Sequence, residues 1–75
     1  MMNNLDNLSK EFGKRIKIER IKKEVSQEKL AELSGLHRTT LGTIENGKTS
    51  PTLDSIAKIA KALNVKMSEL LEGLD

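Results

Sequence analysis

The sequence has no cysteine, tryptophan or tyrosine, and only one proline and one phenylalanine among its 75 residues. Without cysteine, the chain can form neither a disulfide framework nor a thiolate metal site. No apolar stretch is long enough to cross a bilayer, and the first residues, MMNNLDNLSK, lack the apolar region of a signal peptide. We therefore expect a cytoplasmic protein without a membrane partner, built on one small core.

Groups that could support catalysis are equally scarce. His37 is the only histidine, and no acidic pair has the spacing of a catalytic motif. A single histidine in a chain without cysteine also offers no ligand set for a metal ion. The sequence thus predicts a protein that is not an enzyme, with no catalytic residues, no metal and no cofactor.

Positive charge is concentrated near the start of the chain. Seven lysines or arginines stand against three glutamates between Leu8 and Val25, whereas the segment from Ser26 to Lys48 has three of each sign. From Thr49 onward, three basic residues stand against four acidic ones. A basic segment favours a polyanionic partner through phosphate contacts, but it is also typical of a solvated helix face. Charge alone leaves the partner open.

Apolar residues recur at helical spacing, and polar turn residues separate the periodic segments. The expected boundaries are, in chain order, a Ser9 cap before Lys10, a break at Val25–Ser26, Gly35, Asn46–Gly47, a Thr52 cap behind Ser50–Pro51, and Asn64–Val65. These boundaries predict an all-α fold, a compact bundle of five helices. We expect residues 1–8 to be a flexible segment and residues 9–75 to form one domain.

The apolar positions indicate which faces of these helices turn inward. On the first helix, Phe12 and Ile16 form one stripe, and Ile18 and Ile21 form a second edge that predicts contacts on two sides. The helix that follows Thr52 has the broadest apolar face, so we expect it to be central. The other residues expected to point inward are Leu30, Ala31, Leu33, Leu41, Ile44, Leu53, Ile56, Ala57, Ile59, Ala60 and Leu63.

The segment from Gln27 to Asn46, QEKLAELSGLHRTTLGTIEN, has the spacing of a helix-turn-helix. Ala31 is small, as required where two helices cross closely, and Gly35 suits the corner between them. The outer face of the second of these helices carries His37, Arg38, Thr39, Thr40 and Thr43. Such a face suits the major groove of DNA, and it also fits an ordinary helix pair with a solvated side.

The run QEKLAELSGLHRTTLGTIENGKTSPTLDSIAKIAKALNV resembles the Cro/CI-type (XRE) helix-turn-helix family, which includes phage repressors and many small bacterial regulators. The similarity extends from Phe12 to Leu71. It rests on Gln27-x-x-Leu30-Ala31, on Ile44-Glu45-Asn46-Gly47, and on Pro51 four residues after that glycine. The resemblance implies a phage-repressor-like bundle of four or five helices that binds double-stranded DNA.

Residue roles follow from the same resemblance. The positions that match base-reading residues are His37, Arg38, Thr39 and Thr43. The positions expected to contact the DNA backbone are Gln27, Thr40, Asn46, Lys48 and Thr49. Gln27 and Lys48 have an alternative as solvated surface residues, and His37 as an exposed residue without a role. Arg20 and Glu45 match a buried ion pair between the first helix and the end of the third.

The sequence departs from the family pattern in three places, and one of them is the order Ile18-Glu19, which inverts the apolar order often seen before Arg20. Glu24 stands where the family usually has glycine after the first helix, and a left-handed glutamate costs about 1 kcal/mol, which predicts a locally different turn. Gly42 lies inside the third helix, where glycine costs roughly 0.5–1 kcal/mol relative to alanine. Gly42 either lets the helix approach DNA closely or leaves the helix incompletely ordered until the protein binds DNA.

One recognition helix reads only a few base pairs, so we expect a homodimer on a palindromic operator. The residues expected at its interface are Val65, Met67, Leu70, Leu71 and Leu74, which could instead only complete the core of the monomer. The predicted function is sequence-specific transcription regulation by a phage-type repressor or a restriction–modification controller. The alternative is an antitoxin or another regulator that binds a protein partner through its C-terminal helix.

Overall fold

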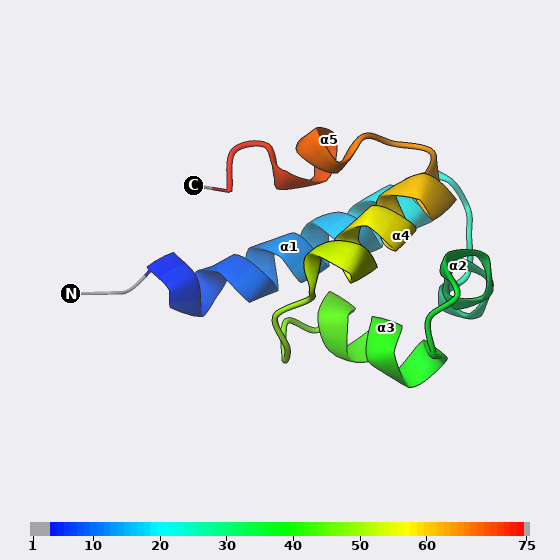
Figure 1. The fold of residues 1–75 in the computed structure, drawn as a ribbon, viewed down its shortest axis with the longest axis horizontal. Coiled ribbons are helices and arrows are strands. Elements are labelled where there is room, and N and C mark those ends of the chain that lie inside the picture. Colours follow the sequence, from blue (N-terminus) through cyan, green and yellow to red (C-terminus); the bar gives the residue numbers. More distant parts are fainter. Residues whose placement is uncertain (1–3, 75) are drawn as a thin grey trace.

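The computed structural model describes the backbone of residues 4–74 and the side chains of residues 7–74. It contains five helices and, within those residues, no strand: α1 (Asn4–Lys22), α2 (Gln27–Ser34), α3 (Arg38–Glu45), α4 (Leu53–Leu63) and α5 (Met67–Leu71). α1 runs through the middle of the molecule, with α3 on one side and α5 on the other (Figure 1). The predicted all-α five-helix bundle is confirmed.

The first helix begins earlier than the sequence pattern predicted. α1 starts at Asn4, not at Lys10, so Ser9 lies within the helix and the prediction of a Ser9 cap was wrong. No glycine or proline occurs between Asn4 and Ser9, so nothing in the backbone chemistry stops the helix from extending. Residues 1–3 lie outside the described part of the chain, and a flexible segment over residues 1–8 stays a prediction.

Two helices start at the hydroxyl caps expected from the sequence. The Ser26 side chain accepts a hydrogen bond from the backbone N–H of Lys29 at 3.0 Å, at the start of α2. The Thr52 side chain accepts one from Ser55 N–H at 3.0 Å, at the start of α4. Each cap satisfies a backbone donor that the helix itself leaves unpaired, which stabilises the helix by about 1 kcal/mol.

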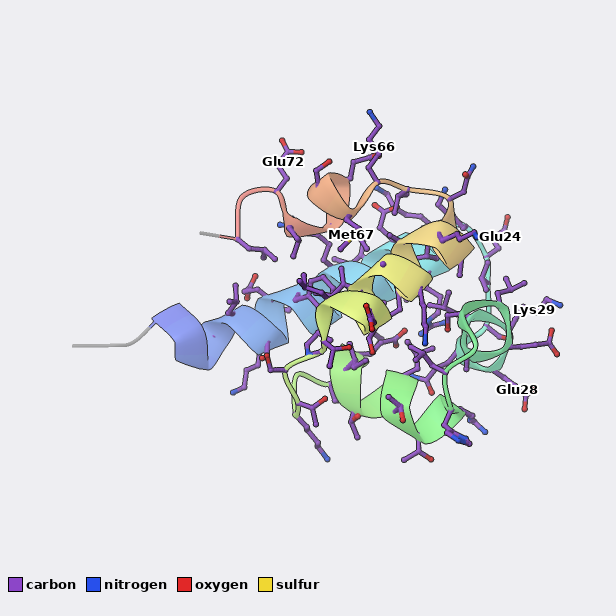
Figure 2. The ribbon with its side chains drawn as sticks, in the orientation of Figure 1. Glu24, Glu28, Lys29, Lys66, Met67 and Glu72 are labelled. Atoms are coloured by element: carbon purple, nitrogen blue, oxygen red, sulfur yellow. The ribbon has the colours of Figure 1, made fainter. Side chains whose placement is uncertain are left out.

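Helices α1 to α4 end in the same left-handed turn, and one of these turns is strained. Gly35 and Gly47 have positive φ after α2 and α3, but after α1 the residue in the left-handed conformation is Glu24, with φ 56° (Figure 2). The N–H of Glu24 bonds to Ile21 O at 2.9 Å, and the next N–H along the chain bonds to the carbonyl of Arg20 at 3.1 Å. The locally different turn predicted from Glu24 is therefore wrong. These two hydrogen bonds hold the left-handed geometry despite the glutamate Cβ.

Replacing Glu24 with glycine is therefore expected to raise the free energy of unfolding by about 0.5–1 kcal/mol. Relief of the left-handed strain of about 1–2 kcal/mol is partly offset by the greater backbone entropy of glycine in the unfolded chain. Urea unfolding followed by circular dichroism measures the change. Glu24→Ala is the control, because it removes the same charge and keeps the strain; an equal gain in both variants would contradict the conformational explanation.

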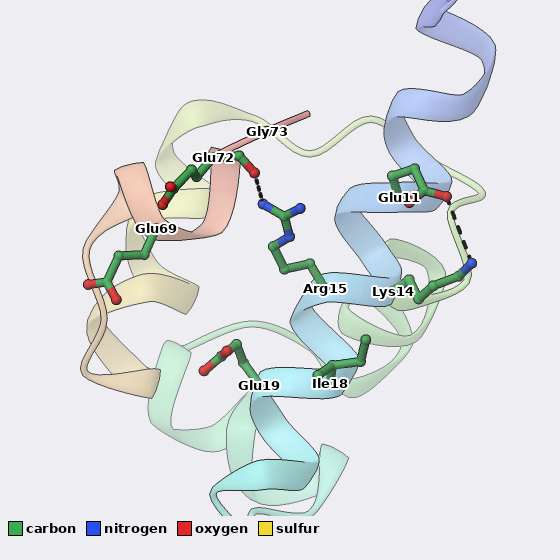
Figure 3. Close-up of a pocket in the computed structure, with 8 residues that line it drawn as sticks. All are labelled: Glu11, Lys14, Arg15, Ile18, Glu19, Glu69, Glu72 and Gly73. Carbon is green, nitrogen blue, oxygen red and sulfur yellow. Dashed lines mark hydrogen bonds and ion pairs between the residues drawn. The ribbon is translucent and has the colours of Figure 1, made fainter. Parts of the chain in front are cut away.

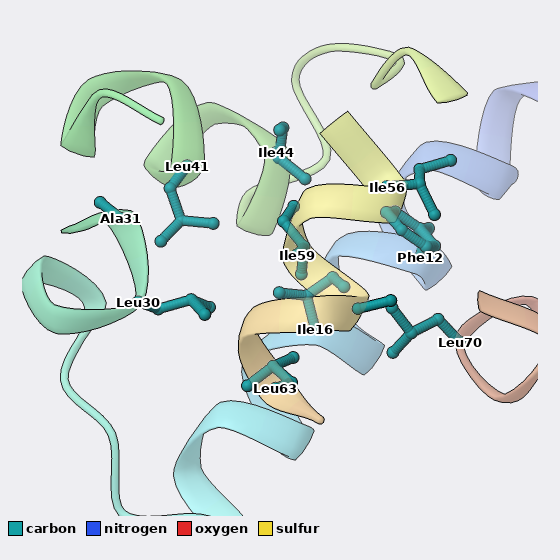
Figure 4. Packing of buried hydrophobic residues seen from close by; sticks show 11 residues of the cluster. Phe12, Ile16, Leu30, Ala31, Leu41, Ile44, Ile56, Ile59, Leu63 and Leu70 are labelled. Carbon is teal, nitrogen blue, oxygen red and sulfur yellow. The ribbon is translucent and has the colours of Figure 1, made fainter. Parts of the chain in front are cut away.

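The core lies where all five helices meet (Figure 4). Its side chains come from every helix, and full burial of each large one contributes about 1.5–3 kcal/mol of transfer free energy. The buried apolar residues are Phe12, Ile16, Leu30, Ala31, Leu41, Ile44, Ile56, Ile59, Ala60, Leu63 and Leu70. α4 supplies four of these, more than any other helix, in agreement with the central place predicted for it.

Several apolar residues expected in the core lie at the surface instead. Leu33 is 52% exposed because the inward stripe of α2 runs through Leu30, Ala31 and Ser34, and Leu33 stands off that stripe. Leu53 is 71% exposed because it is the first residue of α4, one turn before the first buried one. The other exposed residues among those expected to pack are Ile18, Ile21 and Ala57.

Candidate nucleic-acid interface

α3 buries one face and presents a polar face to solvent. Leu41, Ile44 and Glu45 are buried, and they occupy one side of the helix. Of the predicted base-reading residues, Thr39 and Thr43 lie on the opposite side of α3, where Thr39 is exposed and Thr43 is half-buried. His37 and Arg38 stand at the N-terminal end of the helix and are exposed there, and α3 itself lies at one edge of the bundle (Figure 1).

α2 and the turn that follows it set the direction of α3. Ala31 is buried where the two helices pack, and Gly35 makes the corner with φ 73°. Figure 1 looks along the axis of α2, whereas the axis of α3 runs across the picture, so the two helix axes cross at a steep angle. This is the arrangement of a helix-turn-helix, in which the second helix packs one face on the fold and presents the other to solvent.

A buried carboxylate anchors the C-terminal end of α3. Arg20 Nε donates to Glu45 Oε2 at 2.7 Å, and Arg20 Nη2 donates to Oε1 at 3.1 Å, so the pair is bidentate. The Glu45 side chain is only 2% exposed. The guanidinium also donates to the carbonyl of Val25 at 3.0 Å. One arginine therefore joins the last turns of α1, the α1–α2 turn and α3.

Gln27 completes the contacts of this carboxylate. Its Nε2 donates to Glu45 Oε1 at 3.2 Å, and its side chain is half-buried. With Arg20 and Gln27 as donors, the Glu45 carboxylate accepts three hydrogen bonds, which offset the cost of burying its charge. Gln27 thereby ties the first residue of α2 to the last residue of α3.

Two glycines allow α1 to lie directly against the end of α3. A Cβ on Gly13 would come within 2.2 Å of the carbonyl oxygen of Ile44, and a Cβ on Gly47 within 2.6 Å of the Cα of Lys10. Gly13 was not singled out from the sequence, because a single glycine inside a helix can reflect close packing, a bend or no structural requirement. The only available signal was its place among apolar neighbours, between Phe12 and Ile16.

Gly42 faces α2 without crowding. A Cβ at this position would have only the Gln27 amide as a neighbour, at 3.9 Å, which is ordinary contact. Packing inside the protein therefore does not require glycine at this position. Of the two explanations offered for Gly42, close approach to DNA and a helix incompletely ordered before binding, neither is tested by this geometry.

The predicted backbone-contacting residues surround α3. Thr40, Asn46, Lys48 and Thr49 are exposed, the last three in the loop between α3 and α4. The start of that loop is held by the N–H of Lys48, which bonds to the carbonyl of Thr43 at 2.9 Å. The Thr43 hydroxyl donates to the Thr40 carbonyl at 2.8 Å, so its methyl group and the acceptor lone pairs of the hydroxyl remain for other contacts.

The C-terminal segment is fastened to α1 by an arginine that sequence reasoning missed. Arg15 Nη1 donates to the carbonyl of Leu70 at 3.3 Å and also to that of Glu72 (Figure 3). Leu70, predicted at a dimer interface, is 1% exposed and belongs to the core of the protomer. For Leu70 this burial favours the alternative that it completes the core of the monomer, and the dimer interface itself stays a prediction. Leu71 is exposed, and Val65, Met67 and Leu74 are half-buried.

The outer face of α2 carries a surface ion pair. Lys29 Nζ lies 2.8 Å from Glu32 Oε1, and both side chains point into solvent on α2 (Figure 2 labels Lys29). Their hydrogen bond and charge attraction raise the pKa of Lys29 and lower the pKa of Glu32. Because both groups are exposed, the pair contributes little to stability.

Among the side chains of residues 7–74, no group of histidine, cysteine, aspartate or glutamate residues has the geometry of a metal site. Within residues 4–74, no helix combines the length and apolar character that a membrane span requires.

The structure thus has a crossed helix pair whose second helix exposes a polar face and is anchored in an all-helical bundle. This arrangement is typical of helix-turn-helix DNA-binding transcription regulators. Comparison with known families identifies the group within that class. The helix-turn-helix family model HTH_3 matches residues 16–70, and the chain belongs to this family. The resemblance to XRE-type proteins is confirmed.

Several curated relatives are named as control proteins or transcription regulators. Control protein C.BamHI of Bacillus amyloliquefaciens is 45% identical over 62 residues, covering 81% of this chain and 76% of that protein. Control protein C.SmaI of Serratia marcescens is 49% identical over 47 residues, 63% of this chain and 56% of that protein, so the chain spans just over half of it. The crystal structure of the restriction-modification controller protein C.AhdI from Aeromonas hydrophila matches with a TM-score of 0.81 and 42% identity, covering 83% of this chain and 94% of that one.

Proposed function

We propose that this chain is a cytoplasmic transcription regulator that binds a palindromic operator as a homodimer and inserts α3 into the major groove. The observation that carries the proposal is the polar outer face of α3, which is exposed while its inner face is fixed by the core and by Glu45. The major groove is wide enough to admit a helix, and every base pair shows a distinct pattern of donors and acceptors there.

The side chains at the start of α3 are suited to reading bases. Arg38 can bond with both O6 and N7 of a guanine, the most frequent specific contact in protein–DNA complexes. Thr39 offers a hydroxyl and a methyl group, and Thr43 offers its methyl group for apolar contact with thymine. His37 precedes the helix and is exposed, so it can reach the base pair next to these.

The residues around α3 are suited to binding the sugar–phosphate backbone. Lys48 carries a charge on the loop after α3, and Thr40, Asn46 and Thr49 offer neutral hydrogen-bonding groups. Gln27 is half-buried against Glu45 and stands at the N-terminal end of α2, where backbone N–H groups favour an anion. These contacts position the protein on the duplex, and they carry no sequence information themselves.

A homodimer provides the specificity that a single α3 lacks. Two copies related by twofold symmetry would place their recognition helices in successive major grooves, about 34 Å apart. The surface proposed for the contact contains Leu71, which is 39% exposed, with the accessible parts of Val65, Met67 and Leu74. Leu70 supports this surface from inside the protomer.

Within this class we propose the role of a restriction–modification controller, because C.AhdI carries that name, C.BamHI is named a control protein, and both match most of this chain. The second candidate from the sequence, an antitoxin or partner-binding regulator that uses the C-terminal helix, is less well supported. α5 has five residues, and its most buried leucine faces the core.

The proposal is tested by selecting bound fragments from random-sequence duplex DNA and then exchanging two residues. Arg38→Ala is expected to weaken binding to the selected duplex by about 1–3 kcal/mol and to relax the preference at one base pair. Lys48→Ala is expected to weaken binding to selected and scrambled duplexes alike, and to lower the salt dependence of binding.

Affinities are measured by fluorescence anisotropy on both duplexes, and footprinting shows whether two half-sites one helical turn apart are protected together. Equal losses on both duplexes for Arg38→Ala would contradict base reading by α3. Failure to enrich any sequence, with intact binding to a protein partner, would favour the second candidate.

A further inference from the structure

The N-terminal half of α1 lies beside the loop that follows α3. A Cβ built on Gly47 would meet the Cα of Lys10 at 2.6 Å and its Cγ at 2.8 Å. Gly47 immediately precedes Lys48, the charged residue of that loop. The side chain of Lys10 therefore leaves α1 next to the segment to which the proposed function assigns backbone contacts, although the two lysines are 38 positions apart in the sequence.

The close approach of α1 is repeated one turn further along the helix. Lys10, Gly13 and Lys17 are spaced three and four residues apart, so they share one face of α1. Gly13 packs against the carbonyl groups of Ile44 and Glu45, the last residues of α3. Because Gly13 holds this face against the end of α3, Lys10 is fixed in position relative to the recognition helix.

Lys10, like Lys17, has no ion-pair partner among the described side chains, whereas the other two lysines of α1 do. Lys14 lies 3.8 Å from Glu11 and Lys22 lies 3.5 Å from Glu19, so both charges are partly compensated within the helix. Among the side chains of residues 7–74, no carboxylate lies within ion-pair distance of Lys10 or Lys48. Both lysines are exposed. Together they form a positive patch next to the polar face of α3.

We propose that Lys10 is a further DNA-binding residue, which with Lys48 binds one stretch of the sugar–phosphate backbone. The inference rests on the proposed function and adds α1 to an interface otherwise made of α2, α3 and the loop. A lysine that neutralises a phosphate releases a condensed counterion, so each such contact steepens the salt dependence of binding by about 0.9 in log K against log salt. Such a contact strengthens binding to any sequence.

The experiment measures the affinity of the full chain for the selected duplex and for a scrambled duplex over a series of salt concentrations. Lys10→Ala is expected to lower the slope by about one and to weaken binding roughly five- to tenfold at 0.1 M salt on both duplexes. Lys10→Arg keeps the charge and is expected to retain the slope. Lys58→Ala is the matched control, because it removes one exposed charge from the hollow between α2 and α4.

If the slope of log K against log salt is the same for Lys10→Ala as for the parent chain, the proposed role of Lys10 is overturned. If Lys48→Ala lowers that slope in the same series, the proposed function still stands, without a contact from Lys10. An equal fall in Lys58→Ala assigns the effect to net charge and also overturns the proposal. Thermal unfolding of each variant is followed in parallel; a weaker affinity for Lys10→Ala that tracks a lower melting temperature, with an unchanged slope, counts against a phosphate contact.

Discussion

Replacing Arg20 with alanine is expected to lower the free energy of unfolding by about 3–5 kcal/mol. The guanidinium supplies two of the three hydrogen bonds to the Glu45 carboxylate, which is almost fully buried. Its loss leaves a buried charge with Gln27 as its only remaining partner. A small domain has about 5–15 kcal/mol of total stability, so this single change removes a large part of it.

Urea unfolding followed by far-ultraviolet circular dichroism measures this loss. The control is the double variant Arg20→Leu with Glu45→Leu, which removes both charges and fills similar volume. Replacing a whole buried pair with apolar residues is often neutral, so the double variant should be more stable than Arg20→Ala. A double variant that unfolds at the same urea concentration as the single one would show that shape, and not the uncompensated charge, dominates.

Gly13→Ala is expected to cost about 3 kcal/mol, at the upper end of the range for overpacking a core. The added Cβ would lie 2.2 Å from the carbonyl oxygen of Ile44 and 2.7 Å from that of Glu45. Both atoms are backbone, so relief requires α1 or the end of α3 to move as a unit. Because that movement also displaces the polar face of α3, DNA affinity should fall together with stability.

Gly42→Ala is the matched control for this prediction. It adds the same methyl group to a helical glycine, but its Cβ would have only ordinary contact with Gln27, at 3.9 Å. It is therefore expected to raise stability by about 0.5–1 kcal/mol through better helix propensity. Thermal unfolding of both variants checks the contrast. If Gly13→Ala is as stable as the parent chain, the close approach of α1 does not hold the fold together.

The helix-turn-helix could be predicted because its determinants are local. Ser26, Gly35 and Thr52 act through bonds or dihedral angles within a few residues of themselves, so their sequence context is sufficient. The start of α1 was misplaced for a related reason. Ser9 is a suitable cap by type, yet a residue of that type is also tolerated inside a helix that has no other reason to stop.

Burial at the margins of the core could not be predicted from periodicity. Leu30 and Leu33 lie on neighbouring parts of α2, but only Leu30 is enclosed by helices that follow later in the chain, whereas Leu33 lines the open hollow between α2 and α4. Leu70 and Leu71 are adjacent, and only Leu70 points into the core, which is built largely from residues of earlier helices. A pattern shows that a helix has an apolar side but not how wide the partner surface is.

The sequence by itself determined the helical class, five of the helix boundaries marked by caps and left-handed turns, and the polar set on α3, because each depends on neighbours within one or two turns. Only the tertiary structure decided how α1 is seated against the end of α3, through Gly13, Gly47 and the Arg20–Glu45–Gln27 contacts. Those contacts join residues far apart in the chain, and their geometry exists only once the bundle has closed. The same closure places Lys10 beside Lys48 and turns α1 from scaffold into a proposed part of the DNA-binding surface.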